Sequence, residues 1–174
     1  MKDKLKILII FVGCMLFRLI PLRAPNVEPI MASIMPISKK HGATISFLFP
    51  FLSIFIYDMV TNFGSWTWIV SITYGLLGLV SFLYFKKFKS SVTNFVIFAV
   101  FTTIVFDFIT GVLFAPIFGQ TIFSALILQI PFTALHLAGN IGFALTLSPL
   151  INRWLVSKKT FSFRIGEICD VKVS

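Results

Sequence analysis

Long apolar runs separated by short polar junctions make up almost the whole chain. A helix needs about 20 residues to cross a membrane, and most of these runs approach that length. The pattern therefore predicts six transmembrane helices, with a loop and a partial helix in the segment 115–131, which contains two prolines and two glutamines. The predicted spans cover residues 5–22, 27–38, 43–59, 66–85, 92–114 and 132–152.

The second apolar run, 27–38, is short for a crossing at a rise of about 1.5 Å per residue. Five spans plus a re-entrant segment are therefore the alternative arrangement. The first run follows three lysines, as in a signal peptide, but it lacks a clear cleavage site with small residues. A retained first helix is the prediction.

The composition indicates an integral membrane protein. Hydrophobic residues make up 57% of the 174 residues, charged residues 12%, and the mean hydropathy is +0.98. An ordinary soluble domain carries about 25% charged residues, so this class is excluded. We predict an all-α fold with one transmembrane domain, 1–156, and a polar cytoplasmic tail, 157–174.

The positive charge is arranged as in membrane loops and not as in a nucleic-acid-binding face. The net charge is +9, and the basic residues form short clusters between apolar runs. Six spans with the N terminus inside place 13 of the 15 basic residues inside, all but Arg18 and Arg23. Five spans with the N terminus outside place 12 of the 15 inside. Both arrangements put the span ends at Asp58 and Asp107 on the outer side.

Two acidic junctions stand out from the apolar background. Tyr57 to Trp68 contains a carboxylate, an amide, hydroxyls and two indoles, and a shorter version follows from Phe106 to Gly111. An acid at the end of a hydrophobic span is costly, which makes it a candidate functional residue. Asp58 and Asp107 lie 107 − 58 = 49 residues apart, and each is followed three residues later by threonine. This spacing is typical of a repeat of three plus three helices, as found in transporters.

Each candidate residue also has a structural interpretation. Asp58 could contact a ligand, or it could cap the next helix or pair with Arg18 or Arg23. Trp66 could stack on a ligand or simply suit the membrane interface. His136 and Asn140, four residues apart on one helical face, could line a pocket or bond to a neighbouring helix. The predicted substrate-binding residues are Arg23, Asn26, Glu28, Asp58, Thr61, Asn62, Trp66, Asp107, Thr110, His136 and Asn140.

No metal site, cofactor or enzyme activity is predicted. The sequence has no Gly-x-Ser-x-Gly, His-Glu-x-x-His or Walker motif, and Cys14 and Cys169 are far apart in sequence and setting. Asp58 and Asp107 could together form the paired acid of an intramembrane hydrolase. This is the weakest of the functional hypotheses.

Three stretches of the sequence together resemble the S components of energy-coupling factor (ECF) transporters, a family of small bacterial membrane proteins. They are the run Arg18 to Pro21, the segment Pro25 to Ile30 and the Asp58 junction with Gly64 and Trp66. The resemblance covers residues 5–155. It implies a bundle of six helices in the bacterial cytoplasmic membrane that captures a vitamin-like molecule from outside. It also implies two kinds of partner, a transmembrane coupling subunit and two cytoplasmic ATPases.

The sequence departs from this family on the first helix. S components often present an Ala-x-x-x-Ala pattern there for docking, whereas the first span here has only Gly13 as a small residue besides Cys14. Ala32-Ser33 and Gly75/Gly78 are the expected substitutes. The alternative hypothesis is a structural or assembly protein whose polar junctions only hold the helices together.

Overall fold

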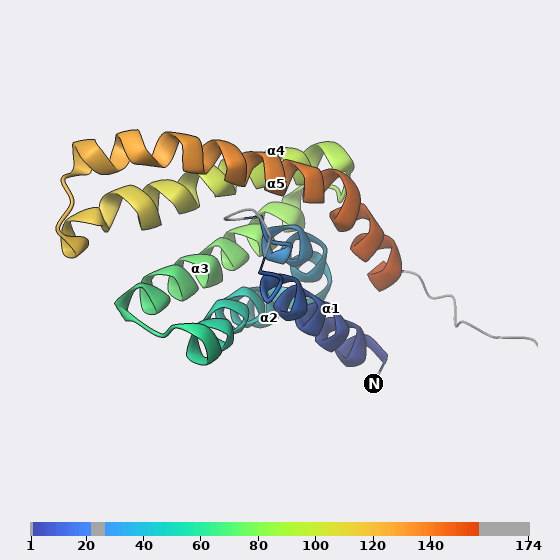
Figure 1. Ribbon diagram of the computed structural model, residues 1–174. Helices are drawn as coiled ribbons and strands as arrows, with labels where there is room; N and C mark the ends of the chain where they lie inside the picture. The colour runs from blue at the N-terminus through green and yellow to red at the C-terminus, as the bar shows by residue number, and fades with distance from the viewer. Residues whose placement is uncertain (1, 22–26, 157–174) are drawn as a thin grey trace, which may run out of the picture.

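The computed structural model describes residues 2–21 and 27–156, and this part of the chain is 89% helix with no strand. The prediction of an all-α fold is confirmed. These residues form five α-helices, which are labelled in Figure 1, with two short helices, η1 and η2, between the last two. In chain order they are α1 (Lys2–Arg18), α2 (Ile30–Thr61), α3 (Ser65–Lys87), α4 (Val92–Asp107), the π-helix η1 (Phe108–Leu113), the 3₁₀-helix η2 (Ala115–Phe118) and α5 (Ile122–Val156).

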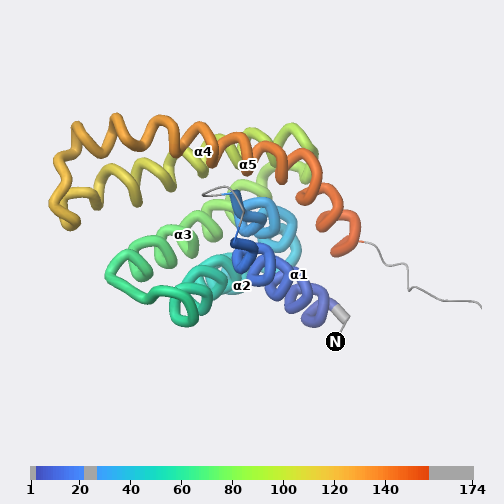
Figure 2. The backbone as a smooth tube through the Cα atoms, viewed as in Figure 1, coloured from blue at the N-terminus to red at the C-terminus, as the bar shows by residue number. Residues whose placement is uncertain are grey.

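Two long hairpins form the body of the molecule. Helices α2 and α3 make one hairpin, α4 and α5 make the other, and α1 lies against α2 (Figure 1). Figure 2 shows that the two hairpins diverge towards their connections at 61–65 and 114–122. A ring cluster of Phe85, Phe95 and Phe98 joins α3 to α4 where the hairpins meet.

Among the described residues, four helical segments are long and apolar enough to cross a membrane, as an integral membrane protein requires. They are Ile30–Thr61, Ser65–Lys87, Val92–Leu113 and Ile122–Val156. The third and fourth predicted spans correspond to the second part of α2 and to α3, and the fifth to α4 with η1. Helix α1 has 17 residues.

The predicted spans 27–38 and 43–59 correspond to two helical arms within α2, which are separated at Gly42, where φ 78° and ψ 179° are not helical. One predicted boundary differs from the structure. The loop after the fifth span ends earlier than expected, because α5 begins at Ile122 and continues through Pro131 into the last span. Proline is tolerated inside membrane helices because neighbouring helices, Ser and Thr side chains and local adjustments of the backbone satisfy the groups that proline leaves unbonded.

Small residues bring α2 and α3 into close contact. A Cβ atom built on Gly78 would lie 1.8 Å from the carbonyl oxygen of Ser46, and the hydroxyls of Ser38 and Ser81 are 2.8 Å apart. A Cβ on Gly75 would meet the ring of Phe47 at 2.6 Å. Gly75 and Gly78 therefore serve the packing of this hairpin. Ala32 and Ser33 are also buried. The expectation that these small residues replace the docking pattern of the first helix stays a prediction.

Lysines from distant parts of the sequence meet at the end where α1 begins and α5 ends. The ammonium of Lys6 donates to the carbonyl of Trp154 at 2.6 Å, and that of Lys39 donates to the carbonyl of Phe88 at 3.0 Å. Lys40, beside the α2 kink, pairs with Asp3 at 2.9 Å. One basic end of the molecule thus contains the start of α1, the kink in α2, the α3–α4 connection and the end of α5.

Candidate functional site

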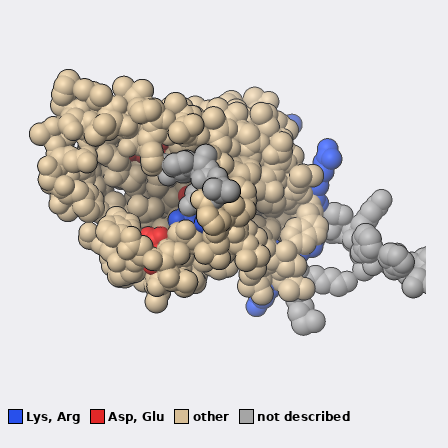
Figure 3. Space-filling view, viewed as in Figure 1, with Lys and Arg blue, Asp and Glu red and all other residues tan. Residues whose placement is uncertain are grey.

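A cavity of about 310 Å³ lies between the two hairpins, beneath the end of α1. Figure 3 shows this face hollowed between the hairpins, with basic and acidic side chains in blue and red inside the hollow. Helices α2, α3, η1 and α5 all contribute to its wall. The lining residues are Arg18, Glu28, Ile54, Val70, Tyr74, Phe106, Thr110, Gly111, Gln129, Phe132 and His136.

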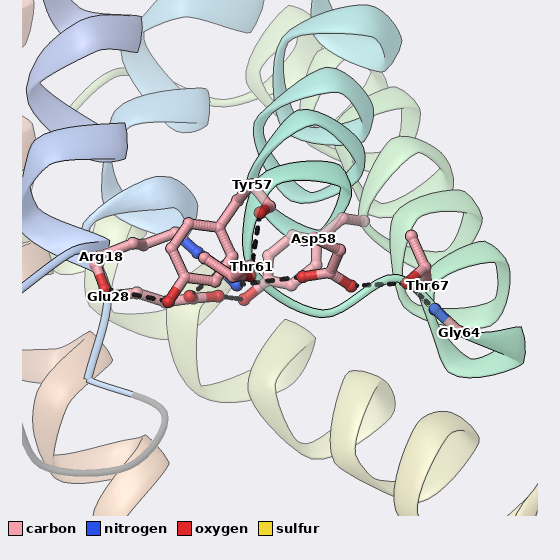
Figure 4. A network of polar contacts seen from close by, with 8 residues as sticks. Arg18, Glu28, Tyr57, Asp58, Thr61, Gly64 and Thr67 are labelled. Carbon is pink, nitrogen blue, oxygen red and sulfur yellow. Dashed lines mark hydrogen bonds and ion pairs between the residues drawn. The ribbon is translucent and has the colours of Figure 1, made fainter.

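A buried ion pair forms one side of the cavity. The guanidinium of Arg18, at the end of α1, donates to one carboxylate oxygen of Glu28, just before α2 (Figure 4). The hydroxyl of Tyr74, on α3, donates to the other oxygen of Glu28. All three residues are less than 10% exposed. Because a charge in this setting needs a partner, these contacts hold the end of α1 and Glu28 against α3.

Asp58 belongs to the same network but does not line the cavity. Its carboxylate accepts a hydrogen bond of 2.8 Å from Thr67, whose oxygen in turn accepts from the backbone N–H of Gly64 at 3.2 Å (Figure 4). The other carboxylate oxygen lies 4.0 Å from the Arg18 guanidinium. These contacts are those of the structural interpretation, in which Asp58 pairs with Arg18 and ties the end of α2 to the start of α3.

A second buried pair lies on the side of α5. Nδ1 of His136 is 2.8 Å from a carboxylate oxygen of Asp107, the last residue of α4, and the two side chains are 1% and 2% exposed. A carboxylate at Nδ1 favours the tautomer with the proton on that nitrogen, which leaves a lone pair on Nε2. Nε2 is buried and has no hydrogen-bond partner among the described residues, although the ring lines the cavity.

Asn140 lies one turn beyond His136 and joins α5 to α4. Its amide donates to the hydroxyl of Thr103 at 2.8 Å, and the side chain is buried. Asn140 is not among the residues that line the cavity. It supports the wall that holds His136, as the helix-bonding interpretation expects.

The other predicted site residues divide into three groups. Thr110 lines the cavity, and its hydroxyl donates to the carbonyl of Phe106 at 2.8 Å. Thr61, Asn62 and Trp66 are exposed at the α2–α3 connection, outside the cavity. Arg23 and Asn26 lie outside the described residues, as do Cys169 and the predicted tail 157–174.

Sequence reasoning missed much of the cavity wall. Tyr74, Phe106, Gln129 and Phe132 line the cavity, and none was predicted. A signal existed for two of them, because Tyr74 and Gln129 carry rare polar groups within otherwise apolar runs. The aromatic pair carried no such signal, since phenylalanine occurs 22 times in the chain.

The π-helix η1 shapes the cavity wall next to Gln129. A Cβ atom built on Gly111 would lie 2.0 Å from Oε1 of Gln129, so this glycine allows the amide to approach η1 closely. Single π-helical turns are often found at functional sites because they turn side chains away from the regular helical register. Among the described residues no group of three or more His, Cys, Asp or Glu side chains is placed to hold a metal ion.

Residues 2–159 match the family described as "Family of unknown function (DUF6580)". Neither a curated protein nor a solved structure matches the chain.

Proposed function

We propose that the chain, which belongs to the DUF6580 family, is a solute-binding membrane subunit of ECF type for a vitamin-like molecule. The observation that carries this proposal is the cavity of about 310 Å³, which is lined by a buried histidine whose Nε2 has no partner among the described residues. Ligand pockets are concave, mostly apolar and fitted with a few convergent polar groups, as this one is. A volume near the lower end of the usual range of about 300–1,000 Å³ suits a small molecule.

Six crossings of the membrane are part of the proposal. They would be α1, the two arms of α2, α3, α4 with η1, and α5. The shared basic end supports this arrangement, because the start of α1 and the end of α5 then lie on one side. The lysine-rich side would be cytoplasmic and the cavity would open towards the outside.

A repeat of three plus three helices is also part of the proposal. Its support is the recurrence of Asp-x-x-Thr at 58–61 and 107–110, each at or near the end of a long apolar helix. The first three crossings would end at Thr61 and the second three would begin at Ser65.

Uptake by such a subunit needs energy from elsewhere. The sequence has no Walker motif, so ATP hydrolysis would come from two partner ATPases joined through a transmembrane coupling subunit. Isolation of the tagged chain from its native membrane, followed by mass spectrometry, tests this part. Recovery of an ATPase pair supports the ECF assignment, and a chain that stays alone while it transports solute contradicts it.

Retention of a small molecule by the purified full chain tests the solute site. The protein is purified in mild detergent, and extracted small molecules are identified by mass spectrometry. In His136→Asn the new amide can still donate to Asp107 in place of Nδ1, while the Nε2 atom is removed. We expect this variant to lose the bound molecule and remain folded.

The matched controls are His136→Gln and His41→Asn. Glutamine places a polar group near the position of Nε2 and should restore part of the binding. His41 is the other histidine of the chain and lies at the basic end, outside the cavity. A folded wild-type protein that carries no small molecule and binds none from a panel of vitamins and their precursors would overturn the proposed function.

A further inference from the structure

Carboxylates outnumber cations around the cavity. Glu28, Asp58 and Asp107 are buried here, against the single guanidinium of Arg18. Arg18 bonds to Glu28 and lies 4.0 Å from Asp58, so it is already occupied by two carboxylates. The formal charges of these four groups sum to 1 − 3 = −2. A negative site away from bulk water favours a positively charged ligand.

Several hydrogen-bond donors of the cavity wall are already in use, although Gln129 has a second amide N–H, and acceptors remain. Arg18 and the hydroxyl of Tyr74 donate to Glu28, and the hydroxyl of Thr110 donates to a backbone carbonyl. The amide of Gln129 contacts Thr133 at 3.4 Å. Nε2 of His136 keeps its lone pair, and the Thr110 oxygen can still accept. A ligand rich in N–H donors matches this wall.

Aromatic rings give the cavity a shape and a second preference for positive charge. The rings of Tyr74 and Phe106 have centroids 4.5 Å apart, and Phe106 meets the edge of the His136 ring at 5.7 Å. Phe132 lines the same space. Aromatic faces attract cations within about 6 Å and stack on flat groups.

We infer that the solute is a small organic cation with a flat ring, whose N–H group donates to Nε2 of His136 while its charge is balanced by Asp107 and Glu28. This inference rests on the proposed function, because it specifies the ligand of the same cavity. According to this inference, neither an anionic nor a neutral solute of the same shape is the preferred ligand.

Three probes of one shape and different charge test the inference: benzylamine, benzyl alcohol and benzoate. Their binding to the full-length protein in nanodiscs is measured by calorimetry at pH 7. We expect benzylamine to bind at least tenfold more tightly than the other two. Asp107→Asn should reduce this preference to less than threefold. Asp3→Asn removes the same charge at the basic end, away from the cavity, and should leave the preference unchanged.

The outcomes separate the inference from the proposed function. Benzyl alcohol or benzoate binding as tightly as benzylamine overturns the cation assignment and leaves the solute site standing. If no probe binds, the charge of the co-purified molecule tests the inference instead. A neutral or anionic co-purified molecule overturns the cation assignment. A protein that binds no probe and retains no molecule overturns both. The wild-type comparison is sufficient should Asp107→Asn fail to fold.

Discussion

The guanidinium of Arg18 connects three segments that are distant in sequence. It bonds to Glu28 before α2, lies 4.0 Å from Asp58 near the end of α2, and sits 4.2 Å from the centre of the Tyr57 ring. The hydroxyl of Tyr57 donates to the backbone carbonyl of Arg18 at 3.2 Å. Such a buried charge is stabilised only while its partners stay in place. The network therefore makes the position of α1 depend on Glu28.

Glu28→Gln is expected to destabilise the protein strongly. Glutamine keeps the size of the side chain but leaves the buried Arg18 without its nearest carboxylate, a loss of about 3–5 kcal/mol for a broken buried pair. Tyr74→Phe removes a single hydrogen bond to Glu28 and should cost roughly 1 kcal/mol. Thermal unfolding in detergent measures both effects.

Asp3→Asn is the control for this series, because the Asp3–Lys40 pair is exposed and worth little. Its unfolding midpoint should equal that of the wild type. A Glu28→Gln protein with a wild-type midpoint would contradict the role given to the Arg18 network.

The sequence identified the chemical groups of the site better than their arrangement. Glu28, Thr110 and His136 line the cavity and were predicted from their polar character in apolar surroundings. Asp58 was also conspicuous, yet Thr67, nine residues further on, holds it at the helix junction. Such a contact depends on how the hairpin closes. Periodicity and composition do not contain that information, and for the same reason the aromatic wall was missed.

At the scale of elements, glycine conformation decides where helices bend or stop. Gly42 has φ 78° and ψ 179°, a region accessible almost only to glycine, and it divides α2 into two arms. Gly119 has φ 77° and ψ 13°, the left-handed helical region, which asparagine also adopts. A Cβ atom on either glycine would have open space around it. Any difference between substitutions at the two positions therefore comes from the backbone.

Gly42→Asn should destabilise the protein by about 1–3 kcal/mol, the cost of a residue held in a disfavoured backbone region. Gly119→Asn should leave the stability nearly unchanged, because asparagine tolerates the left-handed conformation. The unfolding midpoints of the two variants give the comparison. Equal midpoints would mean that the kink at Gly42 is not a constraint on the fold.

Contact between α2 and α3 depends on the missing side chain at Gly78. A Cβ atom there would lie 1.8 Å from a backbone oxygen of Ser46, which cannot move without moving α2. Gly78→Ala should therefore force the hairpin apart and cost about 1–3 kcal/mol or more. The measurement is again the unfolding midpoint.

Gly142→Ala provides the matched control for Gly78→Ala. Gly142 also lies inside a helix, α5, but a Cβ atom there would meet nothing within 4 Å. Alanine should stabilise that helix by about 0.5–1 kcal/mol through its higher helix propensity. A Gly78→Ala protein as stable as Gly142→Ala would contradict the close packing of α2 on α3.

Helices were easier to predict than their connections. The apolar runs 66–85 and 92–114 correspond closely to α3 and to α4 with η1, because serine, lysine or proline lies within two residues of each end of these runs. The short run 27–38 leaves five and six spans open because of its length, although the polar turn expected after it coincides with the non-helical Gly42. Pro131 predicts a break, but a membrane helix can continue through proline.

At the scale of the whole molecule, the two ends differ in charge. Lys6, Lys39 and Lys40 bond to groups at one end, while the buried carboxylates gather around the cavity. A membrane protein with this asymmetry is expected to keep its lysines on the cytoplasmic side. The contact of Lys6 with Trp154 brings the start of the chain to that same side. This favours six crossings over five with a re-entrant segment, for which the N terminus would lie outside.

Labelling of single cysteines separates the two arrangements. In a background with Cys14 and Cys169 replaced, Ser65→Cys is expected to react with an impermeant maleimide added outside intact cells. Lys89→Cys should react only after the membrane is opened, since it follows Lys86 and Lys87 at the basic end. Both arrangements share these two results, so Lys4→Cys decides between them. Protection of this cysteine in intact cells requires the N terminus inside. If position 89 is also inside, the number of crossings between residues 4 and 89 is even, as in the arrangement with six spans. Labelling of Lys4→Cys from outside would instead require α1 to enter from the opposite face, contrary to its contact with the end of α5.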